Sequence, residues 1–187
     1  MTLRSALLYS LAALIGYAAY AFNALVRHRN RVAAAWSDVD VQLRLRADLI
    51  PNLVEVVKGY AAHERGLFQH VTELRSQSLS GGSVKDQSAT GQAMAAALGR
   101  LFAVAEAYPE LKADANFRDL QGKLSQIEDQ IQLSRRYYNG TVRDFNTMIE
   151  SFPSNVIAGV FRFRDADFFL IGDEAARAVP QIEMNKR

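Results

Sequence analysis

The sequence predicts an all-α protein in which an N-terminal transmembrane helix runs into an antiparallel helical bundle of the four-helix type. Three observations support this fold class: an apolar run at residues 5–26, apolar residues recurring every three or four positions over most of the remaining chain, and no segment in which β-branched and polar residues alternate. We divide the chain into a membrane anchor (1–26), a helical bundle (27–155) and a C-terminal tail (156–187), aromatic at first and then charged.

The anchor carries no charged side chain between Arg4 and Arg27. At about 1.5 Å per residue, a helix over residues 5–26 spans about 33 Å, close to the roughly 30 Å hydrocarbon core of a bilayer. A cleaved signal peptide is the alternative, because Ala19 and Ala21 form an A-x-A cleavage pattern. The anchor is favoured because the apolar run continues past this pattern and cations follow it at once.

Three arginines follow the apolar run and outnumber the positive charges before it: Arg27, Arg29 and Arg31. By the positive-inside rule, we expect a single-pass protein of the cell membrane with its body in the cytoplasm. We also expect these side chains to lie at the membrane interface, where anionic headgroups attract cations.

The spacing of apolar residues predicts four long helices. The first continues from the anchor to Pro51, where we expect a break or sharp kink because proline cannot donate a backbone hydrogen bond. The second covers 53–74, and an exposed glycine-containing loop at 78–88 follows it. A third, alanine-rich helix stops at Pro109. The fourth, over 117–152, has the most regular apolar stripe in the chain, which favours packing at about 20° to its neighbours.

Two polar residues have specific predicted places in this pattern. Asp114 is expected to cap the fourth helix. Arg46 falls on the apolar stripe of the first helix, and its long stem is expected to pack while the guanidinium group reaches solvent. A buried ion pair is the alternative.

Seven short blocks of the sequence resemble the signature of the LemA family: residues 30–32, 35–43, 48–54, 57–61, 107–113, 135–139 and 152–155. The resemblance covers about residues 22–170, with departures at Phe22 and in the tail after Phe169. It implies an N-terminal anchor followed by an antiparallel helical bundle, and it implies no reaction. Because some members are encoded near an HtpX-like membrane metalloprotease, the resemblance also implies a protease of this kind as a partner.

The composition argues against several kinds of chemistry. The chain has no cysteine, which excludes disulfides and thiolate chemistry, and its net charge of +2 is too small to indicate a nucleic-acid partner. His63 and Glu64 begin a zinc-protease-like motif, but Leu67 stands where its second histidine would be. We therefore expect no catalytic residues, no metal site and no cofactor, and a protein that is not an enzyme.

Two groups of residues are candidates for binding a partner. One is a run of mixed charge and an amide beside Pro51: Asp38, Asp40, Arg44, Arg46, Asp48 and Asn52. The other is a set of aromatic residues in the tail: Phe161, Phe163, Phe168 and Phe169. For both groups the sequence favours a structural role over binding: a solvated charged surface for the first and, for the second, a tail that folds back over an open end of the bundle.

These observations favour a membrane-anchored, non-catalytic scaffold or adaptor. Its partners are expected to be membrane lipids along the N-terminal helix and a protein bound by the body, and a homo-oligomer is compatible with the sequence. The alternative is a lipid-binding protein that organises or shapes membrane through the arginines and the aromatic tail. An enzyme with a site between helices is the third hypothesis.

Overall fold

The computed structural model describes residues 3–170, and the charged end of the predicted tail, residues 171–187, lies outside this part of the chain. All regular secondary structure within residues 3–170 is helical, so the predicted all-α class is confirmed. The helices are α1 (Leu3–Tyr60), α2 (Arg65–Ser80), α3 (Val84–Glu106), α4 (Pro109–Ala113), α5 (Ala115–Glu150) and α6 (Ser154–Val160).

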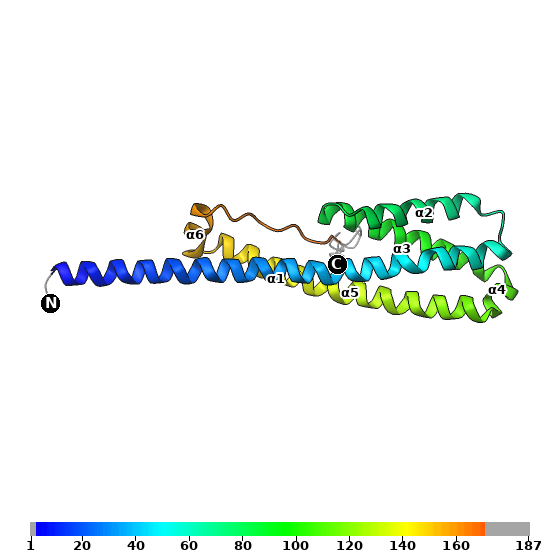
Figure 1. Ribbon diagram of the computed structural model, residues 1–187, viewed down its shortest axis with the longest axis horizontal. Coiled ribbons are helices and arrows are strands. Elements are labelled where there is room, and N and C mark those ends of the chain that lie inside the picture. The colour runs from blue at the N-terminus through cyan, green and yellow to red at the C-terminus, as the bar shows by residue number, and fades with distance from the viewer. Residues whose placement is uncertain (1–2, 171–187) are drawn as a thin grey trace, which may run out of the picture.

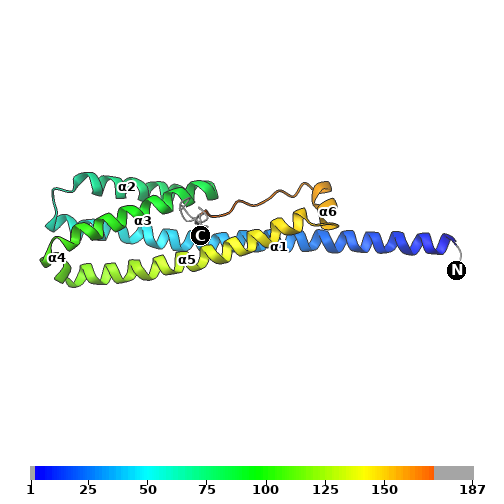
Figure 2. The same cartoon turned by 180° about the vertical axis from the view of Figure 1, so that it is seen from behind.

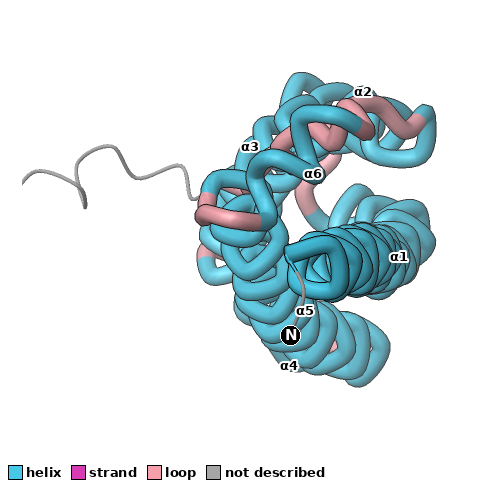
Figure 3. Tube along the Cα trace, turned by 90° about the vertical axis from the view of Figure 1, so that its left-hand side faces the viewer, coloured by secondary structure: helices cyan, strands magenta, loops and turns pink. Residues whose placement is uncertain are grey.

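Two long helices, α1 and α5, lie side by side and antiparallel, and they form the axis of the molecule (Figure 1). The helices α2 and α3 pack on this pair only at the end far from the N-terminus, where they complete an antiparallel four-helix bundle and α4 makes the turn into α5 (Figure 2). At the other end of α5, the short helix α6 packs on α1. The view along the axis shows these helices grouped around α1 (Figure 3).

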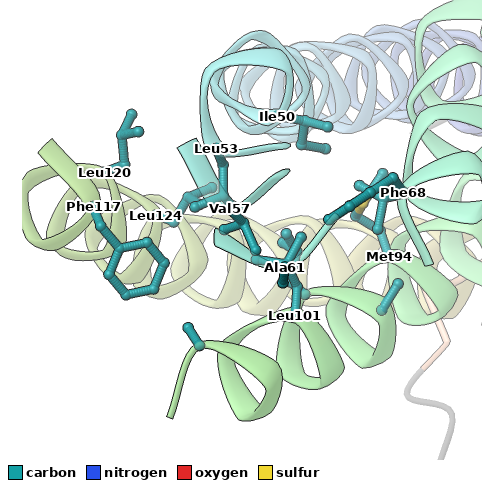
Figure 4. Packing of buried hydrophobic residues seen from close by; sticks show 14 of the residues in the cluster. Ile50, Leu53, Val57, Ala61, Phe68, Met94, Leu101, Phe117, Leu120 and Leu124 are labelled. Atoms are coloured by element: carbon teal, nitrogen blue, oxygen red, sulfur yellow. The ribbon is translucent and has the colours of Figure 1, made fainter. Parts of the chain in front are cut away.

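The apolar residues form two hydrophobic cores along the α1–α5 pair. In the four-helix bundle, Leu53 and Val57 of α1 meet Phe68 of α2, Leu101 of α3 and Leu124 of α5 (Figure 4). The second core lies nearer the N-terminus, between α1, α5 and α6. Its members include Leu25, Val32, Val39, Leu43, Ile131, Tyr138, Val142, Phe145, Ala158 and Phe169. The predicted apolar stripes are thus the faces that these helices bury.

The break expected at Pro51 is wrong, because α1 continues through this residue as a helix. Proline leaves the carbonyl of Ala47, four residues earlier, without its usual helical donor. In the structure the Nε–H of Arg75 on α2 donates to this carbonyl at 2.9 Å. A side chain from a neighbouring helix therefore replaces the missing backbone bond.

The chain turns instead at residues 61–64, within the predicted second helix. Ala61 is fully buried, and α2 folds back so that Val71 and Leu74 face the same core as Val57. An apolar stripe has the same spacing in one continuous helix as in two antiparallel helices that share a core. The periodicity of 53–74 therefore could not locate this turn.

Two helix starts have the capping chemistry that their sequences favour. Asp114 accepts a hydrogen bond from the backbone N–H of Phe117 at 2.9 Å, which confirms it as the N-cap of α5. At the start of α3, Ser83 and Asp86 form a reciprocal capping box. The gap between α2 and α3 is consequently only 81–83, shorter than the predicted loop.

Near the N-terminus, α1 contains one stretch that is long and apolar enough to cross a membrane. Side chains over residues 4–20 are mostly exposed, whereas Ala21, Ala24 and Leu25 are buried. The uncovered segment is thus about 25 Å long at about 1.5 Å per residue. The body of the protein begins to cover α1 inside the predicted anchor.

Candidate functional site

The end of the body nearest the N-terminus is formed by α6 and the part of α1 on which it packs. Ala158 of α6 and Leu25 of α1 are buried in the same core. The opposite face of α6 exposes Val156 and Val160, which are 55% and 70% exposed. Phe152, just before α6, is 82% exposed. An apolar surface therefore lies beside the first covered turns of α1.

The predicted arginines lie on the next turns of α1, and all three are exposed: Arg27, Arg29 and Arg31. The guanidinium carbon of Arg29 lies 5.6 Å from the ring centroid of Phe163, a cation–π contact. The three arginines thus follow Leu25 within about two turns of α1.

Residues 161–170, which we call the strap, run back from α6 over α1 and α5 toward the four-helix bundle (Figure 1). The ring of Phe161 packs on Phe22 with centroids 4.7 Å apart, and Phe163 contacts Phe22 and Phe145. Phe169 is buried with its ring 6.0 Å from that of Trp36.

The four predicted tail phenylalanines therefore differ in what they can offer a partner. Phe169 is buried and Phe163 is half-buried, whereas Phe161 and Phe168 remain 55% and 41% exposed. The described part of the tail therefore lies folded on the body, along α1 and α5.

Two asparagines of α5, which sequence analysis did not single out, hold the strap. Asn146 exchanges two hydrogen bonds with the backbone of Ala166, at 2.9 and 3.0 Å, and Asn139 does the same with Phe169. Seven helical residues span about 10.5 Å, and three extended residues span about 10 Å. The signal in the sequence was the seven-residue spacing of two amides beside the apolar stripe.

Tyr138, one residue before Asn139, adds a third point of attachment, at a strap residue between the two that the asparagines bind. Its hydroxyl group donates to the carbonyl of Asp167 at 2.8 Å. Burial, and to a lesser extent the carboxylate of Asp167, raise the pKa of Tyr138 to about 12. The phenol is therefore held in its neutral, donating form.

The predicted mixed-charge group does not converge into one site. Asp40 and Arg44 form a surface ion pair at 2.8 Å along the same helix. Asp38, Asp48 and Asn52 are exposed. Only Arg46 points into the protein.

Arg46 is 2% exposed, so the expectation that its guanidinium reaches solvent is wrong. Its Nη1 donates to Oε1 of Glu128 on α5 at 2.8 Å, which is the ion-pair alternative. Its Nη2 is buried and has no hydrogen-bond partner among the described residues. Because buried charged groups normally have all their polar atoms paired, this nitrogen is an exception that calls for an explanation.

Arg46 lines a cavity of about 370 Å³ where the four-helix bundle meets the end of the strap. The other lining residues include Gln92 of α3, Glu128 and Arg135 of α5 and Phe169 of the strap. Burial, followed by the positive charge of the neighbouring Arg136, lowers the pKa of Arg135, and Glu128 partly offsets this. The cavity thus combines guanidinium and amide donors with apolar walls, a combination suited to binding an anion.

Comparison with known proteins places these features in a family. The family model for the LemA family matches residues 35–184. Magnetosome protein MamQ of Magnetospirillum gryphiswaldense is 25% identical over 186 residues, which cover 86% of this chain and 68% of that protein. Protein LemA of Metamycoplasma hominis is 28% identical over 138 residues, which cover 73% and 63%.

A second magnetosome relative shows how much of such proteins this chain spans. Magnetosome protein MamQ 1 of Paramagnetospirillum magneticum is 25% identical over 174 residues, which cover 79% of this chain and 64% of that protein. The chain thus spans slightly less than two thirds of this relative.

Proposed function

Because this chain belongs to the LemA family, we propose that it is a single-pass membrane protein whose helical body acts as a non-catalytic scaffold or adaptor at the bilayer. In this proposal α1 crosses the membrane over residues 4–20 and continues without a joint into the body. A rigid connection of this kind holds the four-helix bundle at a fixed distance from the lipid.

The observation that carries this proposal is the exposed apolar surface at the start of α1. Leu7, Leu8 and Leu14 are each more than 60% exposed, whereas the stripes of the other long helices are buried in the two cores. Water-exposed apolar area costs about 25 cal/mol per Å², and lipid removes this cost. The arginines after this segment favour a cytoplasmic body by the positive-inside rule.

Alkaline carbonate extraction of native membranes tests the anchor. The full chain should stay with the membrane pellet, and a variant lacking residues 1–20 should be released, because its cores remain intact without that segment. Release of the full chain at high pH would contradict the transmembrane assignment. Protease treatment of intact cells tests the orientation, and digestion of the body from outside would contradict a cytoplasmic location.

Crosslinking in native membranes followed by mass spectrometry tests the scaffold role. A reproducible protein neighbour crosslinked to the body is the expected result, and a membrane metalloprotease of the HtpX kind is the partner that the family resemblance implies. Turnover of a substrate by the purified protein, abolished by one polar-to-alanine change, would refute the non-catalytic role.

A lipid-binding protein that organises membrane is the second candidate, and the exposed apolar face of α6 favours it. Phe161, the residue after α6, packs on Phe22, which lies about 3 Å along α1 from Tyr20. This end of the body would therefore meet the membrane interface in the proposed placement. The variant lacking residues 1–20 separates the two roles. Binding to vesicles of phosphatidylcholine with phosphatidylglycerol should vanish for a scaffold and survive for a lipid binder, and Val160→Ser should weaken any binding that survives.

A further inference from the structure

We propose that the cavity between α1, α3, α5 and the strap binds a small carboxylate with an apolar body, which Arg46 recognises through its free Nη2. The first support is the unpaired nitrogen itself. Arg46 presents a planar fork of donors that is suited to oxyanions, and Glu128 occupies only its Nη1. A ligand oxygen that reached Nη2 after a small shift of the surrounding side chains would complete the pairing of this buried charge.

The charges and walls of the cavity define the class of ligand. Among the described lining residues, the guanidinium groups of Arg46 and Arg135 face one carboxylate, that of Glu128, which leaves an excess of one positive charge. Leu43, Ile131 and Phe169 supply apolar surface. A monoanion with an apolar body balances both features, and about 370 Å³ lies within the range of small-molecule sites.

In the proposed transmembrane placement of α1, on which this step rests, the cavity lies away from the lipid headgroups. Arg46 lies 20 residues beyond Val26 on one continuous helix, which is about 30 Å along its axis. The ligand is therefore a soluble molecule that reaches the body from the aqueous side.

Gly91 of α3 provides a way to change the cavity without removing a charge. A Cβ atom at this position would lie 3.6 Å from Nη2 of Arg46 and 3.7 Å from Cζ of Phe169. Both are ordinary contact distances, so Gly91→Ala is compatible with the fold while it takes up space beside the free nitrogen. Gly99 lies on the same helix with no atom within 4 Å of its added Cβ, so Gly99→Ala is the matched control.

The test is ¹⁹F NMR of 4-fluorobenzoate titrated against the full chain in detergent micelles. We expect saturable binding, at least tenfold weaker binding for Arg46→Met, and at least tenfold weaker binding of the neutral 4-fluorobenzamide. Gly91→Ala should weaken binding severalfold, and Gly99→Ala should leave it within twofold. The glycine pair keeps the test decisive if the Arg46 variant does not fold.

Three results would overturn the proposal. The first is that 4-fluorobenzoate shows no saturable binding. The second is that Gly91→Ala and a folded Arg46→Met both bind 4-fluorobenzoate as tightly as the unmodified chain does. The third is that inorganic phosphate, added in competition, binds more tightly than 4-fluorobenzoate. The first two would mean that water alone pairs Nη2, and the third that the site selects phosphate. Because the measurement uses neither the membrane nor a protein partner, its outcome is separate from that of the proposed scaffold role.

Discussion

The passage of α1 through Pro51 depends on Arg75, and this dependence can be measured. Arg75 Nε donates to the carbonyl of Ala47, and Ala47 is only 1% exposed. Replacing Arg75 with methionine keeps much of the apolar stem and removes the donor. A buried carbonyl left without this bond should lower the free energy of unfolding by about 1–3 kcal/mol.

A double-mutant cycle isolates the cause of this loss. Pro51→Ala restores the backbone N–H that bonds the Ala47 carbonyl in an ordinary helix. In that background Arg75→Met should cost less than about 1 kcal/mol, because the carbonyl keeps a donor. The expected coupling energy is about 1–2 kcal/mol, above the roughly 0.5 kcal/mol within which independent sites add.

The assay is urea unfolding of the full chain in micelles, followed by circular dichroism at the helical minimum. Arg100→Met is the control, because Arg100 is exposed on α3 and its replacement should change stability by less than about 0.5 kcal/mol. If Arg75→Met costs the same with proline and with alanine at position 51, another interaction carries the helix through and the reasoning is wrong.

Three further predictions concern the strap and the turns. Asn139→Ala removes two hydrogen bonds to Phe169. It should speed hydrogen exchange of the strap amides and change the fluorescence of Trp36, whose ring lies beside that of Phe169. Unchanged exchange would show that packing alone holds the strap. Raising the pH from about 10 to about 12 should lower the free energy of unfolding, because the folded protein keeps Tyr138 protonated up to a pKa of about 12 while the unfolded chain loses the proton near 10. Tyr138→Phe should flatten the dependence of stability on pH in this range. An equally steep loss in that variant would contradict the assignment. Gly81 has φ +75°, so Gly81→Ala should lower the stability of the protein by about 1–3 kcal/mol. Gly59 lies in a helix with open space around it, so Gly59→Ala should raise the stability by about 0.5–1 kcal/mol. Thermal melting temperatures that shift in the same direction for both variants would refute the backbone argument.

Features set by neighbours in the chain could be predicted from the sequence. The helical class, the apolar N-terminal segment and the Asp114 cap all depend on residues close together in the chain, and the structure has each of them. The apolar stripes likewise identified which faces are buried, since burial requires the same three- and four-residue spacing in any packing arrangement.

The candidate site depended on contacts between distant parts of the chain. Arg46 is paired with Glu128, 82 positions away. The Ala47 carbonyl, which Pro51 leaves without a helical donor, is bonded by Arg75, 28 positions away. The strap is held by amides 20 and 30 positions before the backbone that they bind. The helical and apolar segments follow from the sequence alone, because those properties are local. The passage of α1 through Pro51, the turn at 61–64 and the unpaired nitrogen of a buried guanidinium follow from tertiary packing. Each of them depends on which distant group the packing brings close.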